Sequence, residues 1–328
     1  MERFEYANPA SRREAVQLLA ESWGQTEVLA GGTDLISCMK DAMSAPRRVV
    51  SLKRVEDLRG IHYTAARGLR IGSMTTLREI MDNASVQRQY PALIDAADGV
   101  RSEQLRNMGT LGGDLLQRPR CWYFRLGYGL LAQHDGKSMP PEGDNRYHAI
   151  FGNAGPAYFV SPSSFAPILI ALNARAELFG PRGTREIPLE KLFTIPSQAG
   201  EREHTLQSNE IVAEIMVPHP KEIRSAIYEV RQKEALDWPL SAAAVGLRMS
   251  GGTVNGARVV LGQVAPIPWR SPEAERALEG RTITEELADA AGKAAIAKAT
   301  PLSMNGYKVQ LTRIAIKRAI LKAARGGA

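Results

Sequence analysis

Cysteine is scarce in this chain: Cys38 and Cys121 are the only two among 328 residues. Two cysteines make no disulfide framework, and they are too few to hold an iron–sulfur cluster by cysteine alone. Nor does any stretch reach the roughly 18 uncharged apolar residues that a membrane-spanning helix needs. The sequence therefore predicts neither a disulfide scaffold nor a bound metal nor a membrane span, and it favours a reducing compartment.

The start of the chain, MERFEYANPASRREAVQLL, lacks the basic-then-apolar layout of a signal peptide. We therefore expect a cytoplasmic protein; the alternative is the periplasm, reached by co-export with a partner that carries the signal. Hydrophobic residues make up 44% and charged residues 23% of the sequence, which excludes disorder as the main state. The length exceeds one ordinary core, so two or three packed units are expected.

Two common nucleotide-binding motifs are also missing. The dinucleotide fingerprint G-x-G-x-x-G is absent from the glycine-rich sites discussed below, and G-x-x-x-x-G-K-[ST] is absent from the whole chain. A Rossmann fold or a P-loop is therefore not predicted.

Acidic residues are outnumbered, because 42 Lys and Arg against 35 Asp and Glu give a net charge of +7. Such a balance suits nucleic acid, an acidic ligand or an acidic partner protein, and charge alone does not choose among them. The one cluster of basic residues comprises Arg313, Lys317, Arg318, Lys322 and Arg325. The apolar residues between them recur at helical spacing, which predicts an amphipathic C-terminal helix with a basic, solvated face. Because no aromatic residues for base stacking accompany the charges, we favour this helix over a nucleic-acid site.

Patterns along the chain predict three units. Residues 1–56 alternate helix and strand, with strands at 27–30 and 48–52 and a helix at 34–43. Residues 57–220 form a middle unit that ends in a strand at 211–217, and residues 221–328 form an α+β unit. The polar stretch 125–156, rich in Gly and Pro, is long for a connector, so it is either a functional loop or a covering insertion.

Two glycine pairs are candidates for binding a phosphate-containing ligand, in LAGGTDL at 29–35 and TLGGDL at 110–115. Glycine permits positive φ and lets backbone N–H groups approach a ligand without a Cβ in the way, which is how chains cradle phosphate oxygens. Thr33 and Thr110 add hydroxyl groups. A single glycine pair is more often a tight turn, but two such loops suit the two phosphates of a pyrophosphate.

Several motifs together resemble the FAD-binding medium subunits of molybdenum hydroxylases, the family of xanthine dehydrogenase, carbon monoxide dehydrogenase and aldehyde oxidoreductase. They are LAGGTDL (29–35), RIGSMTTLREI (70–80), LRNMGTLGGDLLQRPRCWYFR (105–125), GQVAPIPWR (262–270) and ATPLSMNGYKVQL (299–311). The resemblance spans essentially the whole chain. It implies the three-domain α+β FAD-binding fold of the vanillyl-alcohol-oxidase and CO-dehydrogenase flavoprotein type, with 1–56 and 57–220 holding FAD and 221–328 covering the flavin.

The resemblance also implies which residues lie against FAD. They are Val28, Leu29, Ala30, Gly31, Gly32, Thr33, Asp34 and Leu35 in the first loop; Thr110, Leu111, Gly112, Gly113 and Asp114 in the second; and Val100, Tyr123 and Ile211 elsewhere. No residue of this chain is expected to be catalytic.

The resemblance implies that this chain passes electrons out of a larger enzyme complex to an acceptor. A large subunit with molybdenum cofactor oxidises an aldehyde or N-heterocycle, a small subunit with 2Fe–2S clusters relays electrons, and FAD in this chain passes them to an acceptor. The alternative is a flavin-less scaffold or binding module with the same fold. The sequence does not identify the substrate or the stoichiometry of the complex. The electron acceptor is equally open: NAD, oxygen, a quinone or a protein would each be suitable.

Three departures from the family pattern matter. Relatives with this RCWYFR run can carry a 4Fe–4S cluster in the following loop, but here Cys121 stands alone, so we expect the cluster to be lost and the thiol to be buried. Asp114 replaces the usual Asn, and its carboxylate would repel a pyrophosphate unless it turns away to accept N–H bonds or is offset by Arg118 or Arg120. Glu229, Ala235 and Leu236 replace a family Lys and a Ser-Tyr pair.

Overall fold

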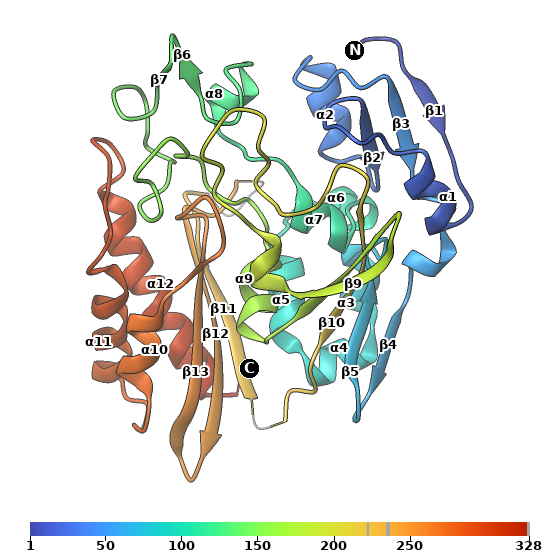
Figure 1. Cartoon of the computed structure of the whole chain (residues 1–328). Helices are drawn as coiled ribbons and strands as arrows, with labels where there is room; N and C mark the ends of the chain where they lie inside the picture. Colours follow the sequence, from blue (N-terminus) through green and yellow to red (C-terminus); the bar gives the residue numbers. More distant parts are fainter. Residues whose placement is uncertain (222, 234–236, 327–328) are drawn as a thin grey trace.

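The structure is a computed structural model that describes residues 1–221, 223–233 and 237–326 (Figure 1). Ala235 and Leu236 lie outside the described residues. The N-terminal part is a parallel sheet of order β1-β3-β2 with short helices. Its elements are β1 (Glu5–Ala7), α1 (Arg12–Gln17), β2 (Thr26–Leu29), α2 (Leu35–Lys40), β3 (Arg48–Ser51) and η1 (Glu56–Leu58). The predicted α/β alternation is confirmed, and the helix expected at 34–43 is shorter.

The middle part is an antiparallel sheet of order β4-β5-β10-β8-β9. Its strands are β4 (Ile61–Thr64), β5 (Gly68–Gly72), β8 (Arg175–Gly180), β9 (Gly183–Pro188) and β10 (Ile211–Val217). With them run α3 (Leu77–Asp82), α4 (Ala84–Gln89), α5 (Pro91–Asp98), α6 (Glu103–Met108), α7 (Leu111–Leu116), α9 (Ala166–Ala171) and η2 (Leu189–Leu192). The central strand β10 has the predicted bounds. Alternate residues from Ile211 to Val217 are buried on one face of the sheet, and Glu214 on the other face pairs with Arg70.

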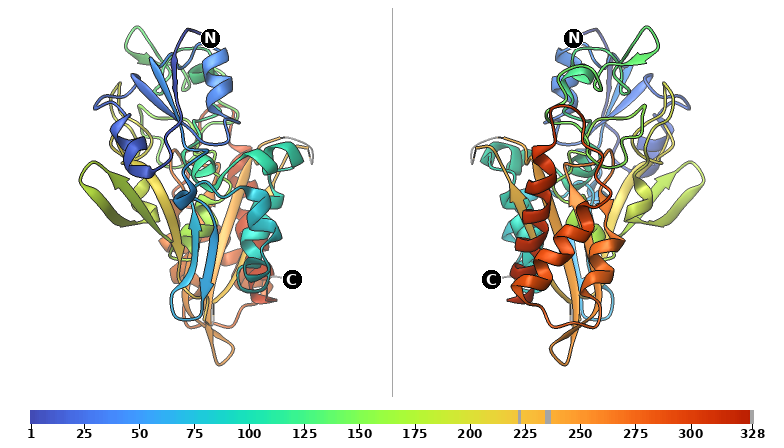
Figure 2. Two further views of the ribbon diagram at one scale, coloured as in Figure 1. Left: turned by 90° about the vertical axis from the view of Figure 1, so that its right-hand side faces the viewer. Right: turned by 90° about the vertical axis from the view of Figure 1, so that its left-hand side faces the viewer.

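The C-terminal part is an antiparallel sheet of order β11-β12-β13-β14, comprising β11 (Ile223–Val230), β12 (Ser241–Ser250), β13 (Thr253–Gly262) and β14 (Trp269–Arg270). Helices α10 (Pro272–Leu278), α11 (Glu285–Ile296) and α12 (Tyr307–Ala324) cover one face (Figure 2). The other face packs on α5 and α9, where a Cβ on Gly246 would lie 2.7 Å from the Ala171 carbonyl oxygen. This close contact joins the C-terminal sheet to the middle unit.

Helix α12 is amphipathic as predicted, with a buried face that includes Ala315, Ile316, Ala319 and Ile320. Three basic residues of the predicted cluster form ion pairs within the chain. Arg313 lies 2.6 Å from Asp289, Lys317 lies 2.7 Å from Glu285, and Lys322 lies 2.7 Å from Asp95. Three of the five basic residues of this cluster are therefore engaged in ion pairs within the chain. Among the described residues, no helix is long and apolar enough to cross a membrane.

The stretch 125–156, called the inserted loop below, follows α8 (Trp122–Arg125) and contains a small hairpin of β6 (Gln133–His134) and β7 (Lys137–Ser138). Its Leu131 packs in a small core with Ala157 and Phe159, which follow the loop in the chain. Asn145 fastens it to the C-terminal part, because its amide donates to the Ser303 hydroxyl at 2.9 Å and accepts from the Met304 N–H at 2.9 Å. The loop is therefore attached to the C-terminal part by these two hydrogen bonds.

Candidate functional site

The two glycine loops, about 80 residues apart in sequence, are in direct contact. A Cβ on Gly31 would lie 1.9 Å from the carbonyl oxygen of Met108, just before the second loop. No side chain fits at that distance, so glycine is required for the backbones to meet. The neighbouring Gly32 has a φ of +84°, a conformation that side-chain-bearing residues rarely adopt.

In the second loop, Thr110 caps α7, and its hydroxyl accepts from the N–H of Gly113 at 3.1 Å. The N–H of Gly112 donates to the Ser73 carbonyl at 2.9 Å, and a Cβ there would lie 2.9 Å from Ser73 Cβ. Gly32 has the positive φ that glycine permits, whereas Gly31, Gly112 and Gly113 do not have a positive φ. Close backbone packing explains Gly31 and Gly112, whereas Gly113 lies within α7 with only the Thr110 hydroxyl nearby.

A cavity opens where the two loops meet β10. Eleven of the sixteen predicted residues line it: Val28, Ala30, Gly31, Gly32, Thr33, Asp34, Leu35, Thr110, Gly112, Gly113 and Ile211. Leu29 and Leu111 do not line it and are buried in the cores behind the loops. The structure therefore brings most of the predicted set to one place.

Three predicted residues lie away from this cavity. Val100 follows α5, where its carbonyl accepts from Arg106 Nη1 at 3.0 Å. Tyr123 lies on α8, with its ring centroid 5.7 Å from that of His148. Asp114 points from α7 into the interior.

The carboxylate of Asp114 is turned away from the cavity and fully hydrogen-bonded. It accepts from the Ser163 hydroxyl at 2.5 Å, from the Phe165 N–H at 3.0 Å and from the Gln117 amide at 3.0 Å. Burial raises the pKa of this carboxyl, opposed by these hydrogen bonds. Of the arrangements considered from the sequence, Asp114 adopts the one in which it joins α7 to the start of α9 and leaves the cavity free.

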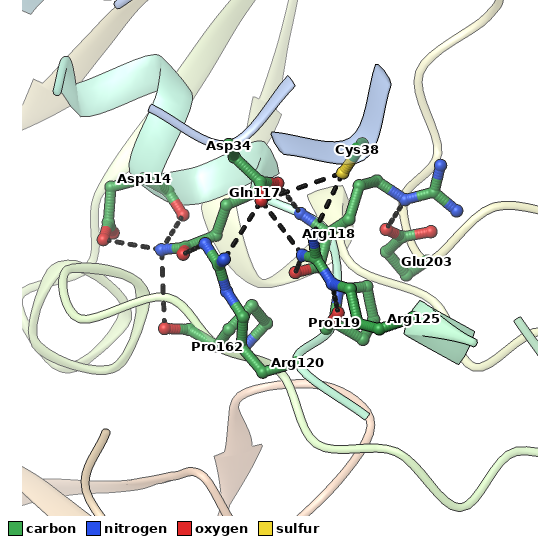
Figure 3. Close-up of polar contacts among 10 residues, drawn as sticks. All are labelled: Asp34, Cys38, Asp114, Gln117, Arg118, Pro119, Arg120, Arg125, Pro162 and Glu203. Atoms are coloured by element: carbon green, nitrogen blue, oxygen red, sulfur yellow. Dashed lines mark hydrogen bonds and ion pairs between the residues drawn. The ribbon is translucent and has the colours of Figure 1, made fainter. Parts of the chain in front are cut away.

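Asp34, the acid of the first loop, is surrounded by cationic groups from segment 117–125 (Figure 3). Its carboxylate accepts from the backbone N–H of Arg118 at 2.7 Å and from Arg125 Nη2 at 2.9 Å, and it lies 3.1 Å from Arg120 Nη1. Beside it, burial raises the pKa of the Cys38 thiol, which therefore stays protonated at neutral pH. The network fixes the start of the inserted loop against the first glycine loop.

Arg118 lies in the cavity wall with a preorganised guanidinium. Its Nε donates to Glu203 Oε1 at 2.6 Å, and its carbon Cζ lies 4.9 Å from the centroid of the Phe124 ring. Within the described part of the chain its two terminal nitrogens make no hydrogen bond. A fork held in this way is well suited to contact phosphate oxygens.

The charges around the cavity fit an anionic ligand. Glu27 and Glu210 also line it, and each is paired, with Arg202 at 3.1 Å and with Arg185 at 2.6 Å respectively. With Asp34 paired as well, every lining carboxylate has a cationic partner, and the two terminal nitrogens of Arg118 make no hydrogen bond to the described residues. A pyrophosphate would meet glycine backbone, threonine hydroxyls and one arginine fork.

Sequence reasoning missed one end of the cavity, formed by Trp23, Arg202 and His204. The Trp23 ring lies edge-on to His204, with centroids 5.3 Å apart, and Arg202 lies 4.6 Å from the Trp23 centroid. Burial lowers the pKa of His204 to about 4. No local pattern links positions 23 and 204, so only the fold could bring them together.

Neither cysteine lies in a metal-binding arrangement. Cys121 Sγ lies 3.2 Å from Nε2 of His148, and burial raises the pKa of its thiol. Over the described ranges, no group of three or more His, Cys, Asp or Glu side chains is placed to hold a metal ion.

Comparison with known proteins shows the family of this chain. Residues 2–220 match the family model described as FAD binding domain in molybdopterin dehydrogenase, and residues 226–323 match the CO dehydrogenase flavoprotein C-terminal domain. The carbon monoxide dehydrogenase medium chain of Hydrogenophaga pseudoflava is 31% identical, covering 97% of this chain and 96% of that one. The aldehyde oxidoreductase FAD-binding subunit of Escherichia coli is 30% identical, covering 95% and 96%.

The fold agrees as well. The carbon monoxide dehydrogenase structure from Hydrogenophaga pseudoflava has a TM-score of 0.77 at 30% identity, over 98% of this chain and 97% of that chain. The chain therefore belongs to the FAD-binding subunits of the molybdopterin dehydrogenases. It is an oxidoreductase subunit, and FAD is the cofactor of its family.

Proposed function

We propose that this chain carries FAD in the cavity between the two glycine loops. We further propose that it transfers electrons from 2Fe–2S clusters of a partner subunit, through FAD, to an external acceptor. The observation that carries the proposal is the contact of Gly31 with Met108, which places both loops at one cavity whose lining carboxylates are all paired.

In this proposal the chain's own residues bind and orient the cofactor. The glycine loops and the hydroxyl of Thr33 face the phosphates, and the terminal nitrogens of Arg118, whose Nε is held by Glu203, donate to them. Asp34 holds the arginine-rich segment against the loop through its 2.7 Å bond to the Arg118 N–H. Bound flavin supplies the redox chemistry, because it takes up electrons singly and releases them singly or in pairs. No acid or base of this chain is required for a chemical step.

The partners follow from the relatives. One is called the medium chain of carbon monoxide dehydrogenase and another the FAD-binding subunit of an aldehyde oxidoreductase, names that imply further chains in those enzymes. For this chain we propose a large subunit with molybdenum cofactor and a small subunit with 2Fe–2S clusters. The complex would oxidise an aldehyde or an N-heterocycle, in the cytoplasm or, with an exported partner, in the periplasm.

Absorbance of the purified chain tests the cofactor. Stoichiometric flavin released on denaturation supports the proposal, whereas a colourless protein that takes up no added FAD would favour the scaffold alternative. Co-expression with neighbouring large and small subunits, followed by size-exclusion chromatography, tests the complex. We expect one co-eluting species that reduces dyes with an aldehyde or N-heterocycle; a lone chain that oxidises such a substrate by itself would refute the electron-transfer role.

A further inference from the structure

Residues 145–148 of the inserted loop are bonded to residues 303–308, at the start of α12. The Met304 N–H donates to the Asn145 side-chain oxygen at 2.9 Å, and the Tyr307 hydroxyl donates to a backbone carbonyl of the loop at 2.8 Å. Met304 and Asn145 are 159 positions apart in the sequence. This junction, called the latch below, holds the end of the inserted loop on the C-terminal part.

A buried cation lies in the latch. Lys308 is 1% exposed. Its ammonium donates to the carbonyls of Gln263 at 2.7 Å, His148 at 3.1 Å and Tyr147 at 3.2 Å, and it forms no ion pair with a carboxylate of the described residues. Burial lowers the pKa of Lys308 to about 7. Below neutral pH the closed latch therefore already contains one positive charge.

The imidazole of His148 lies beside this cation. The residue is 3% exposed, its Nε2 lies 3.2 Å from Sγ of Cys121, and its Nδ1 makes no hydrogen bond to the described residues. A protonated imidazole has two N–H donors, and the one on Nδ1 would here be buried without an acceptor. Proton uptake would also place a second positive charge next to Lys308, which is costly in a buried site.

The groups around this pair offer little compensation. The titratable or charged residues on the surrounding elements are Arg120, Cys121 and Tyr123 at α8, Asp144, Arg146 and Tyr147 in the loop, Asp237 before β12, and Tyr307 on α12. Asp144 is the carboxylate that acts on His148, and it is itself paired with Arg146 at 2.5 Å. Burial and Lys308 lower the pKa of His148 to about 4 against the opposing effects of Asp144 and the Asn145 backbone.

We propose that the latch is a pH-sensitive switch, in which protonation of His148 beside Lys308 releases residues 145–148 from α12. Both side chains then reach water, where their charges are stabilised without a partner. In the closed latch each is buried, and their bonds to neighbouring groups satisfy only the neutral imidazole and a single ammonium.

The released stretch lies between two fixed points. At the start of the inserted loop, Arg125 remains paired with Asp34 at 2.9 Å. Immediately after the latch, the Ile150 N–H donates to the Val264 carbonyl at 2.8 Å. The movement is therefore confined to the loop between these points, and the rest of the fold stays in place.

The direction of the pH effect follows from proton binding. In the closed latch the pKa of His148 is about 4, whereas a released, solvated histidine has a pKa of about 6.5. Because the released state takes up the proton first, the closed latch has its full stability above about pH 6.5 and loses it as pH falls towards 4.

Hydrogen–deuterium exchange of the purified full chain, corrected for the pH dependence of chemical exchange, tests the switch. From about pH 7 to about 4.5, the protection of the Met304 N–H and of residues 145–148 should fall at least about tenfold, while β10 keeps its protection. An equal loss in β10 would indicate global unfolding, and constant protection at the latch would show that it stays closed. Either result overturns the proposal.

Two variants, His148→Gln and His148→Asn, carry no proton-binding side chain in this range and should hold the protection of the latch constant. His134→Gln is the matched control, because His134 belongs to the same loop and its side chain is 67% exposed. It should keep the wild-type response. A pH response that persists in both His148 variants, or that disappears in His134→Gln, would show that His148 is not the switch.

Discussion

Gly31 packs so closely against Met108 that a Cβ would lie 1.9 Å from the Met108 carbonyl oxygen. This contact holds the first glycine loop beside the second, and it explains why a glycine pair recurs about 80 residues later. Each loop has its own turn or helix cap, but the cavity exists only where the two backbones meet.

Gly31→Ala should therefore separate the loops and lower FAD affinity at least about tenfold in a folded protein, since backbone at such a distance must shift. Flavin fluorescence on titration of flavin-free protein measures the affinity, and circular dichroism checks the fold. Gly306→Ala is the control, because a Cβ at Gly306 would meet nothing within 4 Å and its φ is −57°. Normal flavin content in Gly31→Ala would contradict the role of this contact.

Arg118→Gln should weaken FAD and ADP binding about tenfold and reduce the salt dependence of binding, since one charge-assisted phosphate contact would be lost. Arg67→Gln removes the same charge from the exposed turn between β4 and β5 and should leave both constants unchanged. Equal effects of the two substitutions would mean that net charge, rather than the Arg118 fork, sets the affinity.

The raised pKa of Asp114 predicts a pH dependence of stability. Because the folded protein holds this proton at pH values where the unfolded chain, with a pKa near 3.9, has lost it, the free energy of unfolding falls as pH rises above about 4. Asp114→Asn removes the titration, so its stability should vary less over that window. Urea denaturation at several pH values measures the difference, and parallel curves for the two proteins would argue against a raised pKa.

His148 predicts a dependence of opposite sign. Burial lowers its pKa to about 4, below the usual value near 6.5, so the unfolded chain binds the extra proton first and stability falls as pH drops from 6.5 towards 4. His148→Asn should flatten the curve in that range, as measured by the melting temperature. An unchanged slope would show that His148 does not titrate as its burial implies.

Iron analysis of the isolated chain should give essentially none, because Cys38 and Cys121 cannot supply the four ligands of a 4Fe–4S cluster. Four irons per chain would contradict the expected loss of the cluster.

The sequence by itself determined the class of protein and much of the local structure. Short-range patterns predict strand 211–217, the amphipathic C-terminal helix and both glycine loops, because apolar periodicity and paired glycines are properties of a few neighbouring residues. Tertiary structure alone decided which side chains share a cavity. It turned Asp114 inward to Ser163, brought Trp23 to His204, and pressed Gly31 against Met108. These contacts join residues about 50 to 180 positions apart, so they depend on how the sheets and helices pack and not on any local pattern.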